Sequence, residues 1–325
     1  MLYLVEHPVH DNMALPSVVV LPLLIVVAAG VYYIYNEVIH FMSQSIVRNK
    51  VVVITDAVSG LGTECAHLFH KGGARLILCG NTWDKLESLY DQLTNDSDPS
   101  QTFAPKLVIA DFSDMDSMED VVSEVVDCYG CVDVLISNSS MKLKAPVQSV
   151  SLEMDRSIMD MNYFGPSTLA KGIIPTMILR RSGHIVLVNS IQGRLAVPFR
   201  SSYAASKHAA QAFFDCLRAE VKEYGIEVST ISHTFITASE PPPEEGPAPN
   251  TNAVAAFIRS HLVHGVSPSV LANEIIHTVN RKRKEVVLAH PIPRVALYLR
   301  SLFPSFLFAV LAAGAKDSVL NEQMQ

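Results

Sequence analysis

Short apolar runs, rich in valine and isoleucine, alternate with longer amphipathic stretches from about residue 50 onward. The short runs predict strands buried on both faces, over 51–55, 75–79, 106–110, 132–136, 184–189, 226–231 and 285–288. The longer stretches repeat apolar residues at helical spacing and predict helices over 61–71, 83–93, 115–128, 152–180, 203–224 and 268–281. This alternation is typical of an α/β fold, and we expect a doubly wound parallel sheet with helices on both faces.

An uncharged apolar run near the N-terminus extends from 15 to 35. At about 1.5 Å per residue, a helix of this length crosses a bilayer. Acidic Glu6 and Asp11 precede it instead of the basic residues of a secretory signal, which favours an uncleaved membrane anchor over a cleaved signal peptide. Arg48 and Lys50 follow it, so the positive-inside rule predicts that the next domain faces the cytosol.

These features divide the chain into a short flank over 1–14, the anchor over 15–35, a linker over 36–48, the α/β domain over 49–290 and a hydrophobic C-terminal segment over 291–325. Within the last part, 302–315 is apolar except for Ser305. This run is too short to span a bilayer. We interpret it either as part of the core or as a segment that lies on a membrane surface.

Composition narrows the range of functions. The 325 residues carry a formal net charge of −7, which argues against general binding to nucleic acids. No group of cysteines and histidines has the spacing of a metal site, so we expect no bound metal. Among the five cysteines, Cys128 and Cys131 have C-x-x-C spacing but precede a strand. We interpret that pair as structural rather than redox-active.

Tyr203 and Lys207 lie four residues apart on a predicted helix and therefore share one of its faces. A lysine stabilises the phenolate form of a nearby tyrosine, and such a tyrosine can take a proton from an alcohol near neutral pH. The same spacing occurs by chance in many solvent-facing helices. Ser190, at the end of a predicted strand, can direct its hydroxyl toward this helix. The three residues together predict an alcohol–carbonyl redox site that requires a hydride acceptor.

A glycine loop joins the first predicted strand to the first predicted helix. Gly60 and Gly62 let the backbone come close to a pyrophosphate at the helix N-terminus, where amide groups and the helix dipole attract an anion. Two glycines alone are a weak signal, but these follow the first strand of an alternating domain. The loop therefore favours a dinucleotide site.

Several motifs, in order along the chain, resemble those of the short-chain dehydrogenase/reductase family. Residues 55–62 resemble the family's T-G-x-x-x-G-x-G motif, and Asp111 resembles its acidic residue after the third strand. Residues 137–140 resemble N-N-A-G, and 162–165 resemble N-x-x-G. The family's catalytic serine, tyrosine and lysine correspond to Ser190, Tyr203 and Lys207. The similarity spans about 48 to 290. It implies a Rossmann-like fold and a nicotinamide cofactor.

The resemblance also implies a role for each matched residue. Tyr203 is the base in alcohol oxidation and the acid in carbonyl reduction, and Lys207 lowers its pKa. Ser190 orients the substrate oxygen, and Asn162 holds a water molecule that links Lys207 to solvent. The implied cofactor contacts are Thr55, Ser59, Gly60, Leu61, Gly62, Asp111, Asn138, Tyr203, Lys207 and Ile236.

Departures from the family pattern leave a second interpretation open. Asp56 places an acidic side chain beside the expected pyrophosphate, and Ser139 and Ser140 replace alanine and glycine. His233-Thr234 replaces a proline–glycine pair after the sixth strand. We interpret His233 as a substrate contact or, more simply, as a residue with a local structural role. The alternative function is a catalytically weak relative that serves as a membrane scaffold or regulator.

The end of the second strand bears on cofactor choice. Residues 78–82 offer neither a cation for the 2′-phosphate of NADP nor an acid for the 2′-hydroxyl of NAD. Because no cation is available for a 2′-phosphate, the sequence favours NAD as the cofactor, although it does not exclude NADP.

The proline-rich segment over 239–249 lies where the family builds its substrate lid, and we interpret it either as that lid or as an exposed disordered insert. An apolar run over 253–258 follows it in a membrane-anchored chain, so the substrate is predicted to be a lipophilic alcohol, such as a retinoid or steroid. The stretches 49–57, 127–133 and 203–210 resemble a membrane-bound branch of the family. That resemblance implies oxidation of all-trans-retinol with NAD at the endoplasmic or sarcoplasmic reticulum. The family also implies a homodimer paired through the 203–224 helix.

Overall fold

The computed structural model describes residues 24, 26–35, 47–95, 98, 100–236 and 265–323, with side chains as far as 315 in the last range. The chain divides into two compact units, residues 1–45 and 46–325. In the first unit, residues 26–35 are helical with exposed side chains. The rest of the predicted anchor apart from residue 24, and the whole predicted lid, lie outside the described residues. Within the described part of the chain, no helix has both the length and the apolar character needed to span a bilayer.

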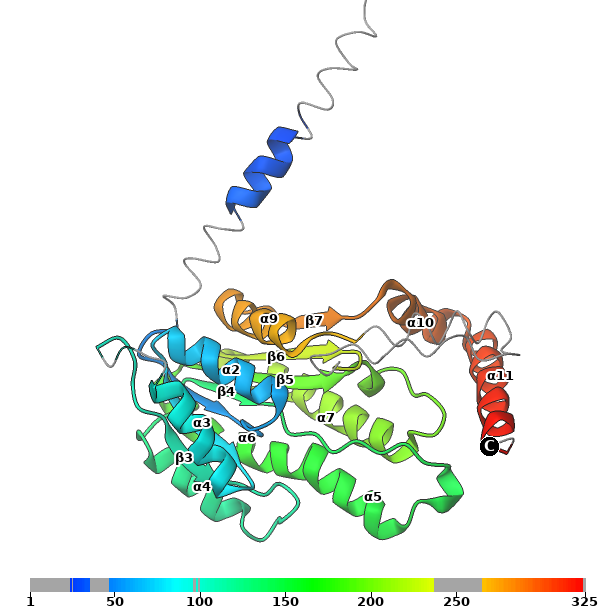
Figure 1. The fold of residues 1–325 in the computed structure, drawn as a ribbon, viewed down its shortest axis with the longest axis horizontal. Coiled ribbons are helices and arrows are strands. Elements are labelled where there is room, and N and C mark those ends of the chain that lie inside the picture. The colour runs from blue at the N-terminus through cyan, green and yellow to red at the C-terminus, as the bar shows by residue number, and fades with distance from the viewer. Residues whose placement is uncertain are drawn as a thin grey trace, which may run out of the picture. The chain divides into compact units, whose positions relative to one another are not determined.

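The described residues of the second unit surround a seven-stranded parallel sheet in the order β3-β2-β1-β4-β5-β6-β7 (Figure 1). The strands are β1 (Val51–Ile54), β2 (Arg75–Gly80), β3 (Lys106–Ile109), β4 (Val134–Ser137), β5 (Gly183–Ser190), β6 (Ile226–His233) and β7 (Glu285–Leu288). Strands β1 and β4 are buried along their whole length, which explains why β1 is apolar throughout and β4 is apolar up to Ser137 at its end. The predicted doubly wound sheet is confirmed. Its strand order reverses at the β1–β4 pair, the point where such sheets bind ligands.

Helices cover both faces of the sheet. On one face lie α2 (Gly60–Lys71), α3 (Trp83–Asn95) and α9 (Pro268–Arg281), and on the other lie α4 (Met118–Asp127), α6 (Gly165–Arg180) and α7 (Ser201–Glu220). Along β1, Val52 and Ile54 enter the first core while Val51 and Val53 enter the second, as expected for alternating side chains on a strand. The two cores hold the β1–α2 loop and the start of α7 in fixed positions relative to the strand ends.

The predicted helix over 152–180 is wrong in one respect, because it is interrupted. α5 (Leu152–Met159) passes into a π-helical turn over Asp160–Phe164, and α6 begins at Gly165. A π-turn inserts an extra residue into the helical path, and this one buries Asn162. Gly165 allows the close approach that follows, since a Cβ there would lie only 2.6 Å from Cδ1 of Phe112.

Two C-terminal helices, α10 (Pro291–Leu302) and α11 (Pro304–Gln323), follow β7. The apolar pattern did not predict either helix. Each begins with a proline, whose missing N–H costs nothing in the first helical turn. The Nη1 of Arg300 on α10 donates to the carbonyl oxygen of Arg194 and lies 3.2 Å from Nε2 of His208 on α7. These contacts hold α10 against the domain.

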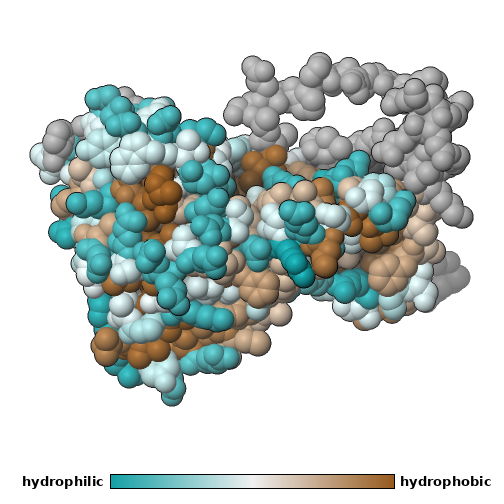
Figure 2. Space-filling model, turned by 90° about the horizontal axis from the view of Figure 1, so that it is seen from below, coloured by the Kyte–Doolittle hydropathy of each residue, from teal (hydrophilic) through white to brown (hydrophobic). Residues whose placement is uncertain are grey.

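The apolar run at 302–315 is only partly buried. Leu307 belongs to the core at 5 % exposure, whereas Leu302, Phe303 and Phe306 are 69 %, 61 % and 61 % exposed. In Figure 2, hydrophobic patches lie among hydrophilic ones at the right-hand end of the molecule, which is where Figure 1 shows α10 and α11. Most large side chains of the 302–315 run are therefore exposed, so the prediction that this run belongs to the core is wrong for them.

Candidate active site

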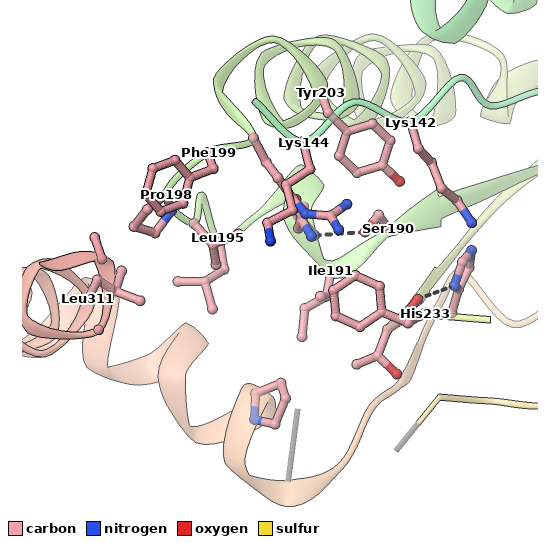
Figure 3. Close-up of a pocket in the computed structure, with 18 of the residues that line it drawn as sticks. Lys142, Lys144, Ser190, Ile191, Leu195, Pro198, Phe199, Tyr203, His233 and Leu311 are labelled. Carbon is pink, nitrogen blue, oxygen red and sulfur yellow. Dashed lines mark hydrogen bonds between the residues drawn. The ribbon is translucent and has the colours of Figure 1, made fainter. Parts of the chain in front are cut away.

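Two adjoining cavities open beyond the carboxyl ends of the central strands. The larger cavity, of about 540 Å³, is lined by the β1–α2 loop, the segments after β4 and β6, and part of α7. The smaller cavity, of about 280 Å³, lies beside the end of β5 and the start of α7, with α10 and α11 contributing a further wall (Figure 3). Lys142 and His233 line both cavities, so the two spaces meet there.

Tyr203, Lys207 and Ser190 converge at this meeting point. Ser190 ends β5, while Tyr203 and Lys207 lie in the first turns of α7. All three side chains are buried, with Tyr203 4 %, Lys207 2 % and Ser190 5 % exposed. Tyr203 and Ser190 line the smaller cavity, where Figure 3 shows the tyrosine ring directed toward the serine, and Lys207 lines the larger one. The Lys207 Nζ lies 5.9 Å from the centroid of the Tyr203 ring.

Burial dominates the acid–base properties of these groups. It raises the pKa of the Tyr203 hydroxyl, although the neighbouring hydroxyls of Ser190 and Ser140 act in the opposite direction. Burial also lowers the pKa of Lys207 to about 7, and the positive charge of Lys142 adds to this effect. At neutral pH Tyr203 is therefore a phenol. This differs from the family-based expectation of a lowered tyrosine pKa, because desolvation outweighs the groups that stabilise the phenolate.

His233 is a buried, neutral imidazole at the end of β6. Burial lowers its pKa to about 4, with the charges of Lys207 and Lys142 contributing in the same direction. Its Nδ1 lies 2.5 Å from the carbonyl oxygen of Thr234. This contact with the backbone fixes the imidazole ring, which is the local structural role predicted for His233. His233 also lines both cavities, so it is positioned for the predicted substrate contact as well.

Thr55 links the end of β1 to the segment after β4 through hydrogen bonds. Its Oγ1 accepts hydrogen bonds from the backbone N–H groups of Asn138 at 2.8 Å and Ser139 at 3.2 Å. The side-chain Nδ2 of Asn138 in turn donates to Ser59 Oγ at 3.0 Å. Thr55 is 1 % exposed and does not line either cavity. Its position suits a residue that holds the loops of the site rather than one that contacts a ligand.

The glycine loop has the geometry of an anion site. Ser59 caps α2 by accepting from the N–H of Gly62 at 3.2 Å. Gly62 admits no side chain, because a Cβ there would lie 2.2 Å from the carbonyl oxygen of Asp56. A Cβ on exposed Gly60 would meet nothing nearer than Pro268 Cγ at 3.9 Å. The N-terminal amides of α2 are therefore accessible from the cavity to an anionic group.

Asp56, which stands where the family pattern has a glycine, has a left-handed backbone conformation. Its φ is 49°, in the left-handed region that aspartate and asparagine tolerate better than most residues. Burial raises the pKa of its carboxyl group, against the effects of a hydrogen bond with Ser59 and the charge of Lys85. Asp56 is among the residues that line the larger cavity, so its negative charge lies close to an anionic ligand bound there.

Asn162 holds the segment that follows β4. Its Oδ1 accepts from the N–H of Met141 at 2.6 Å, and its Nδ2 donates to the Met141 carbonyl at 2.9 Å and to Ser206 Oγ at 2.9 Å. These bonds join the π-turn, the Met141 segment and α7 behind Tyr203 and Lys207. The water link from Asn162 to Lys207 stays a prediction.

The other residues chosen from the sequence separate into two groups. Those that line the larger cavity are Ser59, Gly60, Leu61, Asn138, Lys207 and Ile236. Gly62 supports the loop from behind, and Asp111 lines neither cavity. The Oδ1 of Asp111 instead accepts from the N–H and hydroxyl of Ser113 at 2.9 and 2.6 Å, which orders the turn after β3.

Sequence reasoning missed the cationic and C-terminal residues of the smaller cavity, namely Lys142, Lys144, Arg200, Val310 and Leu311. Lysine at two alternate positions after the fourth strand, in Lys142-Leu-Lys144, was the one visible signal. Contact between α11 and the site leaves no local pattern, because it depends on how a distant segment folds back.

Comparison with known proteins decides the family. A model of the short chain dehydrogenase family matches residues 50–240, which is more than half of the chain. The chain belongs to this family. It is therefore an oxidoreductase of the short-chain dehydrogenase fold, and a nicotinamide cofactor is consistent with its relatives.

Its curated relatives match along most of their length. Dehydrogenase/reductase SDR family member 7C-A of Danio rerio is 66 % identical over 96 % of this chain and 100 % of that protein. Family member 7C of Homo sapiens is 54 % identical over 94 % of this chain and 98 % of that protein. A member 7B protein of Bos taurus is 42 % identical over 92 % and 91 %. The resemblance to member 7C thus extends beyond the motifs of the active site.

Solved structures of distant relatives share the fold. A short-chain dehydrogenase from Streptomyces avermitilis has a TM-score of 0.64 at 24 % identity, covering 83 % of this chain and 97 % of that one. A metagenomic short-chain oxidoreductase in complex with NADP has a TM-score of 0.59 at 18 % identity, covering 74 % and 97 %. At such low identity the likeness shows the fold alone.

Proposed function

We propose that this chain interconverts a lipophilic alcohol and its carbonyl compound by hydride exchange with NAD, with all-trans-retinol as a candidate substrate. The observation that carries the proposal is the meeting of two cavities of different character at Tyr203, Ser190 and Lys207. The larger cavity has an accessible helix N-terminus suited to a dinucleotide. The smaller one has an extensive apolar lining suited to the body of a lipophilic alcohol.

The residues of the larger cavity fit a nicotinamide dinucleotide. Gly60 leaves open space in front of the α2 amides, as a pyrophosphate requires. At the other end of the cavity, Lys207 and Ser140 adjoin Tyr203, which suits the ribose and nicotinamide. Among the described residues of this cavity, Asp56 opposes the fit through its negative charge. When bound, the nicotinamide supplies the hydride acceptor or donor.

The proton chemistry falls to Tyr203 and Ser190. Ser190 Oγ accepts from the N–H of Gln192 at 3.1 Å, which leaves its own hydrogen free to donate to a substrate oxygen. Tyr203 then takes the proton of an alcohol or gives one to a carbonyl oxygen. Because the pKa of Tyr203 is raised, reduction has its acid ready at neutral pH, whereas oxidation should quicken as the pH rises.

Calorimetry should find tighter binding of NAD than of NADP to the purified protein. The turn after β2 presents Asn81, whose Oδ1 accepts from Thr82 Oγ1 at 3.0 Å, and it offers no cation to a 2′-phosphate. The comparison is necessary because two solved structures with this fold hold NADP or 5-hydroxy-NADP. Tighter NADP binding would reverse the assignment and would point to Lys85, at the start of α3, as the phosphate partner.

We further propose that the 15–35 run anchors the chain in the membrane of the endoplasmic or sarcoplasmic reticulum, with the catalytic unit facing the cytosol. The uncharged run and the cations that follow it support this orientation. Asn95 begins a glycosylation sequon, Asn95-Asp-Ser97, and lies exposed at the end of α3. Expressed in animal cells, the protein should carry no sugar at Asn95, as read by glycosidase treatment. A glycan there would place the unit in the lumen.

Asp56 favours the second candidate function, a catalytically weak relative that acts as a scaffold or regulator. A carboxylate on the wall of the larger cavity weakens an anionic cofactor's binding through like-charge repulsion. Absence of NAD binding at millimolar concentration would support this candidate over the enzyme. The homodimer paired through α7 also stays a proposal, which sedimentation of the detergent-solubilised protein can test.

A further inference from the structure

Three cations gather at the smaller cavity, although the chain as a whole is acidic. Lys142, Lys144 and Arg200 line this cavity, and the net charge of the chain is −7. Lys142 and Lys144 lie on the segment after β4, while Arg200 directly precedes α7. Two separate parts of the chain therefore deliver positive charge to one apolar pocket beside Tyr203.

No acidic side chain among the described residues balances these cations. The described lining of the smaller cavity contains no aspartate or glutamate, and none of the ion pairs found in the described ranges involves Lys142, Lys144 or Arg200. Partial burial and then the charge of Arg200 lower the pKa of Lys142, so the cations are near enough to repel one another. Lys142 and Lys144 are exposed and Arg200 is half-buried, so all three cations can reach an acidic group bound in this cavity.

Arg200 is especially hard to explain as a structural residue. It occupies the N-cap of α7, where an acceptor such as serine or aspartate stabilises a helix and a cation opposes the helix dipole. Its side chain makes no capping bond. Its guanidinium carbon instead lies 5.0 Å from the ring centroid of Phe235, which holds it at the wall of the cavity.

The position of the cations separates them from the cofactor. Lys142 lines both cavities and can serve a dinucleotide, but Lys144 and Arg200 line the smaller cavity alone. Figure 3 shows Lys144 directed into this cavity, with Tyr203 and His233 on one side and Leu311 and Pro198 on the other. The charge of Arg200 also reaches Tyr203, since it helps to lower the pKa of that hydroxyl against the larger effect of burial. The cations thus lie toward the reacting end and the apolar wall lies farther away.

We propose that the smaller cavity binds a hydroxy or oxo acid with an apolar tail, whose acidic group is held by Lys144 and Arg200 close to the reacting carbon. The tail then contacts Leu195, Val310 and Leu311. This inference rests on the proposed oxidoreductase function and specifies its substrate class. A neutral alcohol such as retinol fills the apolar part and leaves the cations unpaired.

The test compares an acid with its own ester. Full-length protein in detergent is given NAD and either 3-hydroxydecanoate or its methyl ester, and kcat/KM is measured from NADH absorbance. A charge-assisted hydrogen bond contributes about 1.5–3 kcal/mol, so we expect the acid to be preferred by roughly 10- to 100-fold. Lys144→Met and Arg200→Met should each lower the acid-to-ester ratio about tenfold, and the double variant should bring it near unity. Lys222→Met, which removes an exposed lysine far from the cavity, should leave the ratio unchanged.

A second readout keeps the proposal independent of turnover. Calorimetry with the NADH-loaded protein, which cannot oxidise an alcohol, should give at least tenfold tighter binding of the acid than of the ester, with the same dependence on Lys144 and Arg200. Equal binding of acid and ester, or equal effects of the variants on both, would overturn the proposed substrate class. If retinol is oxidised without any preference for acids, the oxidoreductase function stands and this inference fails. If acid binding is selective but no alcohol is oxidised, the anion site stands and the proposed reaction fails.

Discussion

Replacing Tyr203 with phenylalanine should lower turnover in both directions by about 10²- to 10⁴-fold, the usual contribution of one general acid–base group. The substitution removes a single oxygen from a ring that is 4 % exposed, so the fold around it should persist. NAD affinity should change little, because Tyr203 lines the smaller cavity and not the larger one. Initial rates of NADH formation, together with calorimetric NAD binding, measure the two effects separately.

Tyr224→Phe is the matched control, since Tyr224 lies in the 3₁₀ turn after α7, away from both cavities. It should keep full activity. Oxidation by the unmodified protein should also rise with pH, because the raised pKa of Tyr203 leaves little phenolate near neutrality. A Tyr203→Phe protein with ordinary turnover, or with the same pH dependence as the parent, would assign the proton transfer to another group.

Lys207→Met should abolish activity and at the same time stabilise the fold. Lys207 is 2 % exposed, and burial lowers its pKa to about 7, so below that pH the folded protein carries a buried charge. Replacement of buried ionic groups by apolar ones of similar size is often stabilising by about 1–4 kcal/mol. We expect a gain of this size at pH 6, measured by urea unfolding. Lys222→Met, at an exposed lysine, should leave the free energy of unfolding unchanged.

The pH dependence of that stability has a definite sign. An unfolded lysine titrates near 10.4, so between about pH 7 and pH 10 the unfolded chain binds a proton at Lys207 that the folded chain does not. Stability from this group therefore rises with pH across that window, by about 1.4 kcal/mol per pH unit, and Lys207→Met should lack this rise. Destabilisation by Lys207→Met at pH 6 would mean that other groups already compensate the buried charge.

Much of the sheet could be predicted because parallel strands buried on both faces must be apolar at every position. β1 shows this well, since it is buried along its whole length and its predicted ends agree with the structure to within one residue. The break at Asn162 could not be predicted, because a π-turn shifts the helical pattern by one residue and leaves its apolar spacing nearly intact. The helices α10 and α11 were missed for a different reason. The apolar residues of α11 are spread around the helix and give no helical spacing, whereas α10 has one apolar face, and that pattern was overlooked.

The candidate site could be predicted only where its residues have fixed spacing. Tyr203 and Lys207 share one helix, and the glycine loop lies between one strand and the next helix, so both patterns are local. The cationic cavity is assembled from the segment after β4, the start of α7 and α11, and no local spacing connects these parts. The effect of Asp56 could be predicted only in part. Its charge indicated an impaired loop, but its left-handed backbone conformation depends on the fold and could not be predicted.

The most direct test of the hydride-transfer function uses all-trans-retinol that carries deuterium at the carbinol carbon. Full-length protein is incubated with this substrate and NAD, and the NADH formed is analysed by mass spectrometry. Transfer of one deuterium to the nicotinamide by the unmodified protein, and none above background by Tyr203→Phe, is the expected result. Failure to form deuterated NADH from this alcohol or from deuterated 3-hydroxydecanoate, under conditions where NAD is bound, would contradict the assignment of this site as an alcohol–carbonyl oxidoreductase.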